Sequence, residues 1–182
     1  MRQEAKKEPS DEADERQLEL AQEEGEAYQR SLRYMSQDVA NTGDMKAVDD
    51  FEVAFAQEEA EGMYHFRDGE LEWVEPDEDD NCHLEVAVSD VADGRFVPAL
   101  EVTATLESEG CEEVGPVELP FVWHPGLHHY GKNLQVPGDG TYTISVHVDP
   151  PTFPRHDEQN GNRYDEAVDV EFEDVHVETG RE

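Results

Sequence analysis

Three histidines fall within six residues in the stretch from Phe121 to Leu134, at His124, His128 and His129. Imidazole is the commonest protein ligand for borderline transition metals, and such ligands gather in loops that a rigid scaffold holds in place. A short histidine-rich tract is equally typical of a solvated loop. The stretch therefore indicates a metal site only if other parts of the chain supply further ligands.

Further ligands occur in two other segments. His83 and Glu85 lie on the same side of an alternating segment whose apolar residues point the other way. His156 lies in a loop that several prolines make stiff. Each of these residues alone is typical of an ordinary surface position. Together with His124 and His129, however, they offer nitrogen ligands from three separated segments, which is how a metal site on a β-sandwich is assembled.

The segments that must hold these side chains have the pattern of β-strands. Apolar and polar residues alternate with a period of two, and turns rich in Gly, Pro and Asp separate the segments. The pattern predicts strands at 51–56, 63–66, 70–74, 83–91, 96–106, 114–122, 141–148 and 167–177. Because short strands follow one another and the second half has no helical pattern, the sequence predicts an all-β fold, an immunoglobulin-like antiparallel β-sandwich.

Two of these strands carry a more specific expectation. Asp93-Gly94 is a strong hairpin signal, which predicts that the strand ending at 91 turns directly into the strand at 96–106. Pro116 and Pro120 interrupt the segment 114–122. Proline cannot donate a hydrogen bond to a neighbouring strand, so this segment is expected at the edge of a sheet.

The first 48 residues differ from the rest. We expect an acidic N-terminal extension at 1–48, partly disordered and then helical, ahead of a β-sandwich metal-binding domain at 49–182. Helix formers dominate from about Glu12 to Ala40, and Gly43 suits the end of that helix. For residues 1–14, a disordered acidic arm is an equally good interpretation.

The chain carries 47 acidic and 13 basic residues, which gives a formal net charge of −34. Such a surface repels nucleic-acid phosphates and anionic lipid, so we expect no nucleic-acid partner. Acidic residues spread over a chain that keeps its core strands indicate adaptation to high salt. No apolar run is long enough to span a membrane, and the first residues carry no hydrophobic signal region. Both an exported protein that has lost its signal and a cytoplasmic protein fit these observations.

The two cysteines, Cys82 and Cys111, form no CxxC pair, which argues against a zinc ribbon or a thioredoxin-like site. One disulfide between them remains an alternative, and two unpaired thiols are the favoured interpretation.

Four motifs in this sequence, in the same order, resemble those of the periplasmic ferrous iron transport proteins of bacteria. The motifs are His83-Leu84-Glu85, the segment 96–102, the segment His129-Tyr130-Gly131-Lys132-Asn133, and Pro150-Pro151 with Arg155-His156-Asp157. The resemblance covers roughly residues 51–175. It implies a copper-binding β-sandwich that forms a homodimer and serves iron uptake outside the cytoplasm.

The resemblance also implies a set of metal ligands. The family's three ligand histidines match His83, His129 and His156, and a nearby family carboxylate matches Glu85. The family's methionine ligand has no counterpart, because the ungapped position is Val122. His124 is the nearest residue that can bind metal, and Met63 is a second candidate for the missing ligand. Without a thioether the site should prefer Cu(II), Zn(II) or iron to Cu(I).

The sequence thus predicts a binding protein for a copper or iron ion, with zinc as a further possibility, that is accessory to an iron-uptake system. Transport then requires a membrane iron permease as partner, because the chain itself has no segment to insert in a membrane. Two alternatives stay open. One is a metal-dependent β-sandwich enzyme, redox or hydrolytic, although no general base beyond Glu85 and no nucleophile motif such as GxSxG stands out. The other is an immunoglobulin-like interaction domain that binds no metal.

Overall fold

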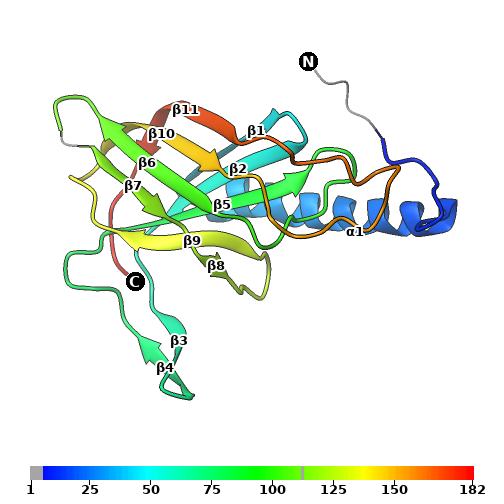
Figure 1. Ribbon diagram of the computed structural model, residues 1–182. Helices are drawn as coiled ribbons and strands as arrows, with labels where there is room; N and C mark the ends of the chain where they lie inside the picture. Colours follow the sequence, from blue (N-terminus) through cyan, green and yellow to red (C-terminus); the bar gives the residue numbers. More distant parts are fainter. Residues whose placement is uncertain (1–5, 112) are drawn as a thin grey trace.

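The structure is a computed structural model that describes residues 6–111 and 113–182 (Figure 1). The chain begins with helix α1 (Glu15–Tyr34), which continues into a π-helical turn, η1 (Met35–Val39). The strands that follow are β1 (Thr42–Val48), β2 (Phe51–Glu58), β3 (Met63–Arg67), β4 (Glu70–Val74), β5 (Cys82–Asp90), β6 (Val102–Ser108), β7 (Val114–Glu118), β8 (Phe121–Val122), β9 (His129–Leu134), β10 (Gly140–Val148) and β11 (Val168–Val177). Of the arm predicted to be disordered, residues 1–5 lie outside the described part.

The strands form two main antiparallel sheets, with the order β1-β2-β5-β9-β8 in one and β11-β10-β6-β7 in the other. Residues from both sheets share one apolar core. Strands β3 and β4 pair with each other and project from the body as a hairpin (Figure 1). This arrangement confirms the predicted antiparallel β-sandwich with an N-terminal helix.

Strand β5, at the centre of the five-stranded sheet, is buried on both faces. The side chains that point into the core are Leu84, Val86 and Val88. Those that point outwards are His83, Glu85, Ala87 and Ser89, and all four are also buried. A further layer must therefore cover the outer face of this sheet.

Helix α1 and the turn η1 form that layer (Figure 1). The helix begins with a capping box, in which the Asp14 carboxylate accepts from the Gln17 amide and the Gln17 side chain accepts from the Asp14 amide. Leu32 and Met35 pack on small residues of the outer sheet face, which are Ala54, Ala56 and Ala87. The helix predicted at the N-terminus is thus confirmed, and it is docked on the sandwich.

The turn predicted at Asp93-Gly94 is present, with backbone hydrogen bonds from Asp90 to Arg95 and from Val97 to Val88 across it, but the long strand predicted directly after it is wrong. Strand β6 begins only at Val102, and it pairs with β10 and β7 in the opposite sheet. After β5 the chain makes a single bridge between Ser89 and Phe96. The pairing cannot continue along β5, because β9 occupies that side of β5 from Val86 onwards, where Tyr130 lies opposite. After this short return beside β5, the segment crosses to the other sheet.

The edge position predicted for 114–122 is confirmed, but the segment is divided between the sheets. Strand β7 lies at the edge of the four-stranded sheet, and β8 lies at the edge of the five-stranded sheet. Pro120 lies between them, at the crossing. Strands β1 and β9 were not predicted, and β9 includes the last of the clustered histidines.

The structure confirms the two unpaired thiols, with Cys82 buried and Cys111 exposed. Among the described residues, no helix has the length and apolar character needed to cross a membrane.

Candidate metal centre

The candidate site is built on β5 and β9, which pair with Glu85 opposite Gly131. Side chains two residues apart on a strand share a face, so His83 and Glu85 of β5 meet His129 of β9 on the outer face of the sheet. The Nε2 atom of His129 lies 3.2 Å from the Glu85 Oε1 atom, and the Nε2 atom of His83 lies 3.6 Å from it. Ligand atoms of all three residues lie within 4.8 Å of one another. One cation can therefore contact all three side chains.

Both imidazole rings are held by their other nitrogen. Nδ1 of His83 lies 2.9 Å from the Asn133 side-chain oxygen, and Nδ1 of His129 lies 2.9 Å from the Leu127 carbonyl. The Asn133 amide group donates to the Glu61 carbonyl, which fixes its orientation so that the oxygen faces His83. Each Nδ1 must therefore carry the proton, and each Nε2 presents a lone pair to the site. This is the second-shell pattern of metal-binding histidines.

Burial sets the electrostatics of the three groups. The exposed fractions of His83, Glu85 and His129 are 0%, 3% and 1%. Burial lowers the pKa of each histidine to about 4, and burial with the nearby Glu58 and Glu61 raises the pKa of Glu85 to about 9. Both rings are thus neutral ligands at pH 7, and Glu85 is protonated until a cation replaces its proton.

Three buried polar atoms here have no hydrogen-bond partner among the described residues, namely Nε2 of His83, Nε2 of His129 and Oε2 of Glu85. A buried polar atom without a partner costs about 1–3 kcal/mol, so such atoms are rare unless a ligand uses them. All three belong to the same group and have the donor chemistry of a transition-metal site. The residues present therefore fit a metal ion.

Two more carboxylates border the group. Glu58 lies opposite His83 in the pairing of β2 with β5, and Glu61 Oε1 lies 3.8 Å from the His83 Nε2 atom. Oxygens of Glu58, Glu61 and Glu85 also lie within 4.8 Å of one another. Burial raises the pKa of both Glu58 and Glu61. Sequence reasoning missed Glu58 and the role of Asn133, because both depend on how the strands pair.

His124 lies at the rim of the group. Its ring centroid is 5.8 Å from that of His129, and its Nδ1 accepts hydrogen bonds from the amides of Gly126 and Leu127. These bonds hold the turn at 123–128 and leave Nε2 as the atom able to bind metal. His124 is thus close to the site but outside the group that shares the 4.8 Å limit.

His156 is not brought to this group within one chain. Its side chain is 91% exposed, and its Nδ1 pairs with the Glu12 carboxylate at 2.8 Å. Within a single chain the predicted convergence of three segments is therefore reduced to two, β5 and β9. Met63 lies at the start of the projecting hairpin, where it pairs with Val74 of β4.

Comparison with known proteins gives relatives in both sequence and structure. The UPF0423 proteins of Brucella abortus and Brucella suis are 30% identical over 125 residues, which cover 59% of this chain and 68% of theirs. The copper-reconstituted P19 protein of Campylobacter jejuni has a TM-score of 0.64 at 20% identity, over 77% of this chain and 96% of that one. FetP of uropathogenic Escherichia coli strain F11 has a TM-score of 0.63 at 23% identity, over 75% and 94%.

These two structural likenesses show the fold, and structures of copper-bound variants of both proteins have also been solved. The family is shown by sequence. The model of the family described as "Fe2+ transport protein" matches residues 40–178, which include all the strands from β1 to β11 and the site on β5 and β9. The chain belongs to the Fe2+ transport protein family.

Proposed function

We propose that this protein binds one copper or iron ion through His83, Glu85 and His129, as an accessory of an iron-uptake system. The observation that carries the proposal is the set of three buried donor atoms that lack a partner and face one another. Family membership and the copper-bound structures of P19 and FetP support it. The role is binding and transfer, without a catalytic step by the protein.

The donor set decides which ions fit. Two imidazole nitrogens and one carboxylate oxygen suit Cu(II), Zn(II) and iron, whereas Cu(I) prefers the sulfur ligands that this group lacks. Glu58 and Glu61 add further oxygen donors on the same side. We therefore expect Cu(II) and iron to bind in preference to Cu(I).

Two predicted ligands complete the proposal. His124 is close enough to supply a fourth ligand after a small rotation of its ring, since its Nε2 is the nitrogen that the turn does not use. His156, exposed and distant from the group of its own chain, would have to come from a second copy. This places a homodimer in the proposal, with each site shared between the two subunits.

The cellular role follows from the family. Iron uptake requires a membrane permease, and the described residues contain no helix that spans a membrane, so we propose such a permease as partner. The protein would exchange the copper or iron ion with the permease before the ion enters the cell. This exchange takes place outside the cytoplasm. We therefore propose an extracytoplasmic location.

Equilibrium dialysis against Cu(II), Zn(II) and Fe(II) tests the binding role. Wild-type protein should bind Cu(II) tightly, and the His129→Ala variant should bind it at least about 100-fold more weakly, since loss of an outer-shell partner alone costs 10–100-fold. His176→Ala, which removes an exposed histidine of β11 in the opposite sheet, is the matched control and should bind as the wild type does. Equal affinities of all three proteins would contradict the proposed site.

Mixing variants tests the shared site. His83→Ala and His156→Ala each remove one ligand, and a mixed dimer of the two places both losses in one site and leaves the other intact. The mixture should regain a fraction of the tight copper sites that neither variant has alone. No recovery, in a sample shown to contain mixed dimers, would remove His156 from the ligand set.

A further inference from the structure

We infer that residues 6–39 form a lid that closes over the metal centre. The inference rests on the proposed function of that site and adds how access to it is controlled. The three ligand side chains point outwards from the sandwich and are nevertheless buried. His83, Glu85 and His129 point away from the core of the sandwich, and yet none is more than 3% exposed.

The N-terminal segment supplies much of the cover. Ala56 lies directly opposite Glu85 in the pairing of β2 with β5, and it belongs to the cluster in which Leu32 and Met35 pack on the outer face. Leu127, from the turn that follows His124, closes the same cluster. The end of α1 and the turn η1 therefore lie over the strand positions beside the ligands.

Tyr28 connects the helix directly to the ligand loop. Its hydroxyl donates to the His128 carbonyl at 2.9 Å, next to the ligand His129. The helix thus contacts the loop that orients one of the two imidazoles.

The helix is seated by a close backbone approach at Gly25. A Cβ atom at this position would lie 1.7 Å from the Asp93 carbonyl oxygen, so only glycine permits the observed docking. One turn further, the Gln29 amide donates to Ser89 Oγ at 2.9 Å and to the Gly94 carbonyl at 3.2 Å. Any larger side chain at Gly25 must lift the helix from the sheet.

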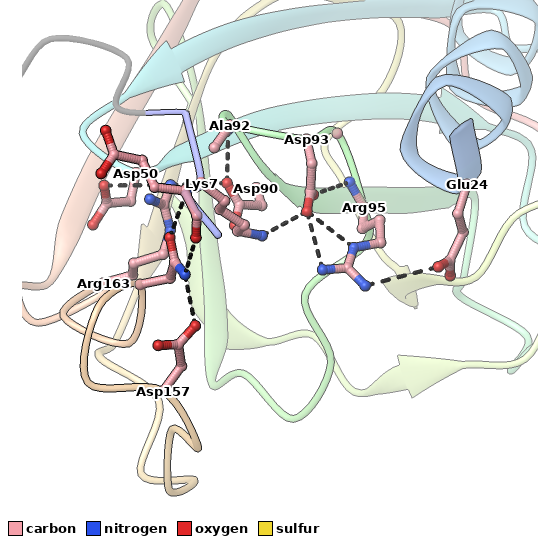
Figure 2. Close-up of polar contacts among 12 residues, drawn as sticks. Lys7, Glu24, Asp50, Asp90, Ala92, Asp93, Arg95, Asp157 and Arg163 are labelled. Carbon is pink, nitrogen blue, oxygen red and sulfur yellow. Dashed lines mark hydrogen bonds and ion pairs between the residues drawn. The ribbon is translucent and has the colours of Figure 1, made fainter. Parts of the chain in front are cut away.

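An ionic latch holds the start of the segment, as Figure 2 shows. The Lys7 ammonium lies 2.8 Å from the Asp90 carboxylate and 2.6 Å from that of Asp93, with only 15% of the lysine side chain exposed. Asp90 also pairs with Arg163 at 2.9 Å, which joins the latch to the loop before β11. The arm is tied to that loop again where Ser10 donates to Asp157.

Residues 6–39 can undock without disrupting the β-sandwich. Among the described residues, the core between the two sheets contains none before Phe51, with Val48 at its margin. The family match likewise begins at residue 40, so the matched region holds the whole site without the helix. The segment is thus a layer added on a complete domain. The apolar cluster around Leu32 and Met35 and the ion pairs of Lys7 help to hold it there.

A docked lid should slow the passage of ions and reagents to the imidazoles, and an undocked one should not. The Gly25→Gln variant tests this, because it wedges the helix away while improving its intrinsic helix propensity. Ala27→Gln, at an exposed position of the same helix, is the matched control. Two rates are measured. One is the modification of His83 and His129 by diethyl pyrocarbonate in metal-free protein, mapped by peptide mass, and the other is the removal of bound Cu(II) by EDTA.

The wedge variant should show both rates at least about tenfold above those of the wild type and of Ala27→Gln, with the thermal unfolding of the sandwich still cooperative. Equal rates in all three folded proteins would overturn the lid. If no protein binds copper and the modification rates still differ, the lid stands and the proposed function fails. If Gly25→Gln does not fold, Lys7→Gln replaces it, with Lys6→Gln as the control. Both rates should then rise by a smaller factor, and equal rates would again overturn the lid.

Discussion

Glu85 and His129 face each other across β5 and β9, with 3.2 Å between Oε1 and Nε2, although both side chains are buried on the outer side of their sheet. Burial keeps Glu85 protonated in the metal-free protein, whereas a cation bound between the two groups would favour its carboxylate form. The pair therefore has two stable arrangements that differ by one proton. The first two predictions follow from this exchange.

Metal binding should release protons near neutral pH. At pH 7, His83 and His129 are already neutral because their pKa values are about 4, whereas Glu85, with a pKa of about 9, must lose its proton. We expect about one proton to be released per Cu(II) ion and the affinity to rise from pH 7 towards pH 9. Calorimetric titration in two buffers of different ionisation enthalpy measures the released protons. An affinity independent of pH over this range would contradict the prediction.

Replacing Glu85 by Gln should change how the stability of the metal-free protein depends on pH. The folded pKa of Glu85, about 9, exceeds the ordinary value of 4.5, so its contribution is present below pH 4.5 and is lost as the pH rises towards 9. Between pH 6.5 and 9, above the ordinary histidine pKa, the wild type should lose up to about 1.4 kcal/mol per pH unit relative to Glu85→Gln. Urea unfolding of both proteins with a chelator present gives the difference. Parallel curves would show that Glu85 is not protonated in the fold.

Asn133 should act as a positioning residue for His83. The Asn133→Ala variant leaves Nδ1 of His83 without its acceptor, so the ring can turn or change its tautomer. We expect Cu(II) affinity to fall 10–100-fold, with an altered copper electron paramagnetic resonance spectrum. Lys132→Ala, at the adjacent exposed position, is the control. If the affinity falls while the spectrum stays that of the wild type, the effect is structural and the assignment to positioning is wrong.

Salt should stabilise the fold. The net charge of −34 makes the compact state repel itself, and salt screens this repulsion. Raising KCl from 0.1 to 2 M should increase the unfolding midpoint by about 4 °C or more, equivalent to about 1–2 kcal/mol at this chain length. Differential scanning calorimetry at several salt concentrations measures the shift. A midpoint that does not move would argue against adaptation to high salt.

The parts of the fold that sequence predicts are those with a clear local pattern. The alternation in β10 and β11 and the helix formers before Ala40 each determine an element without reference to the rest of the chain. The extent of strand pairing after the turn at Asp93-Gly94 could not be predicted in this way. The turn forms, but the place beside β5 is taken by β9, and the next strand, β6, pairs with β10 in the opposite sheet.

The candidate site shows the same division. His83 and Glu85 share a face because a strand has a period of two, and the family motif adds His129, so these residues were predictable. The carboxylate of Glu58 and the orienting role of Asn133 depend on strand register, which local sequence does not specify. The cover of the site by α1 depends on a contact between Gly25 and Asp93, which are 68 residues apart in the sequence. No pattern in either segment indicates this contact.

Anomalous diffraction from crystals of the copper-loaded protein, collected on both sides of the copper absorption edge, tests the central claim most directly. We predict one strong copper peak within bonding distance of Nε2 of His83, Nε2 of His129 and a carboxylate oxygen of Glu85. A peak at other residues, with these three side chains still unliganded and buried, would contradict the assignment of the metal centre.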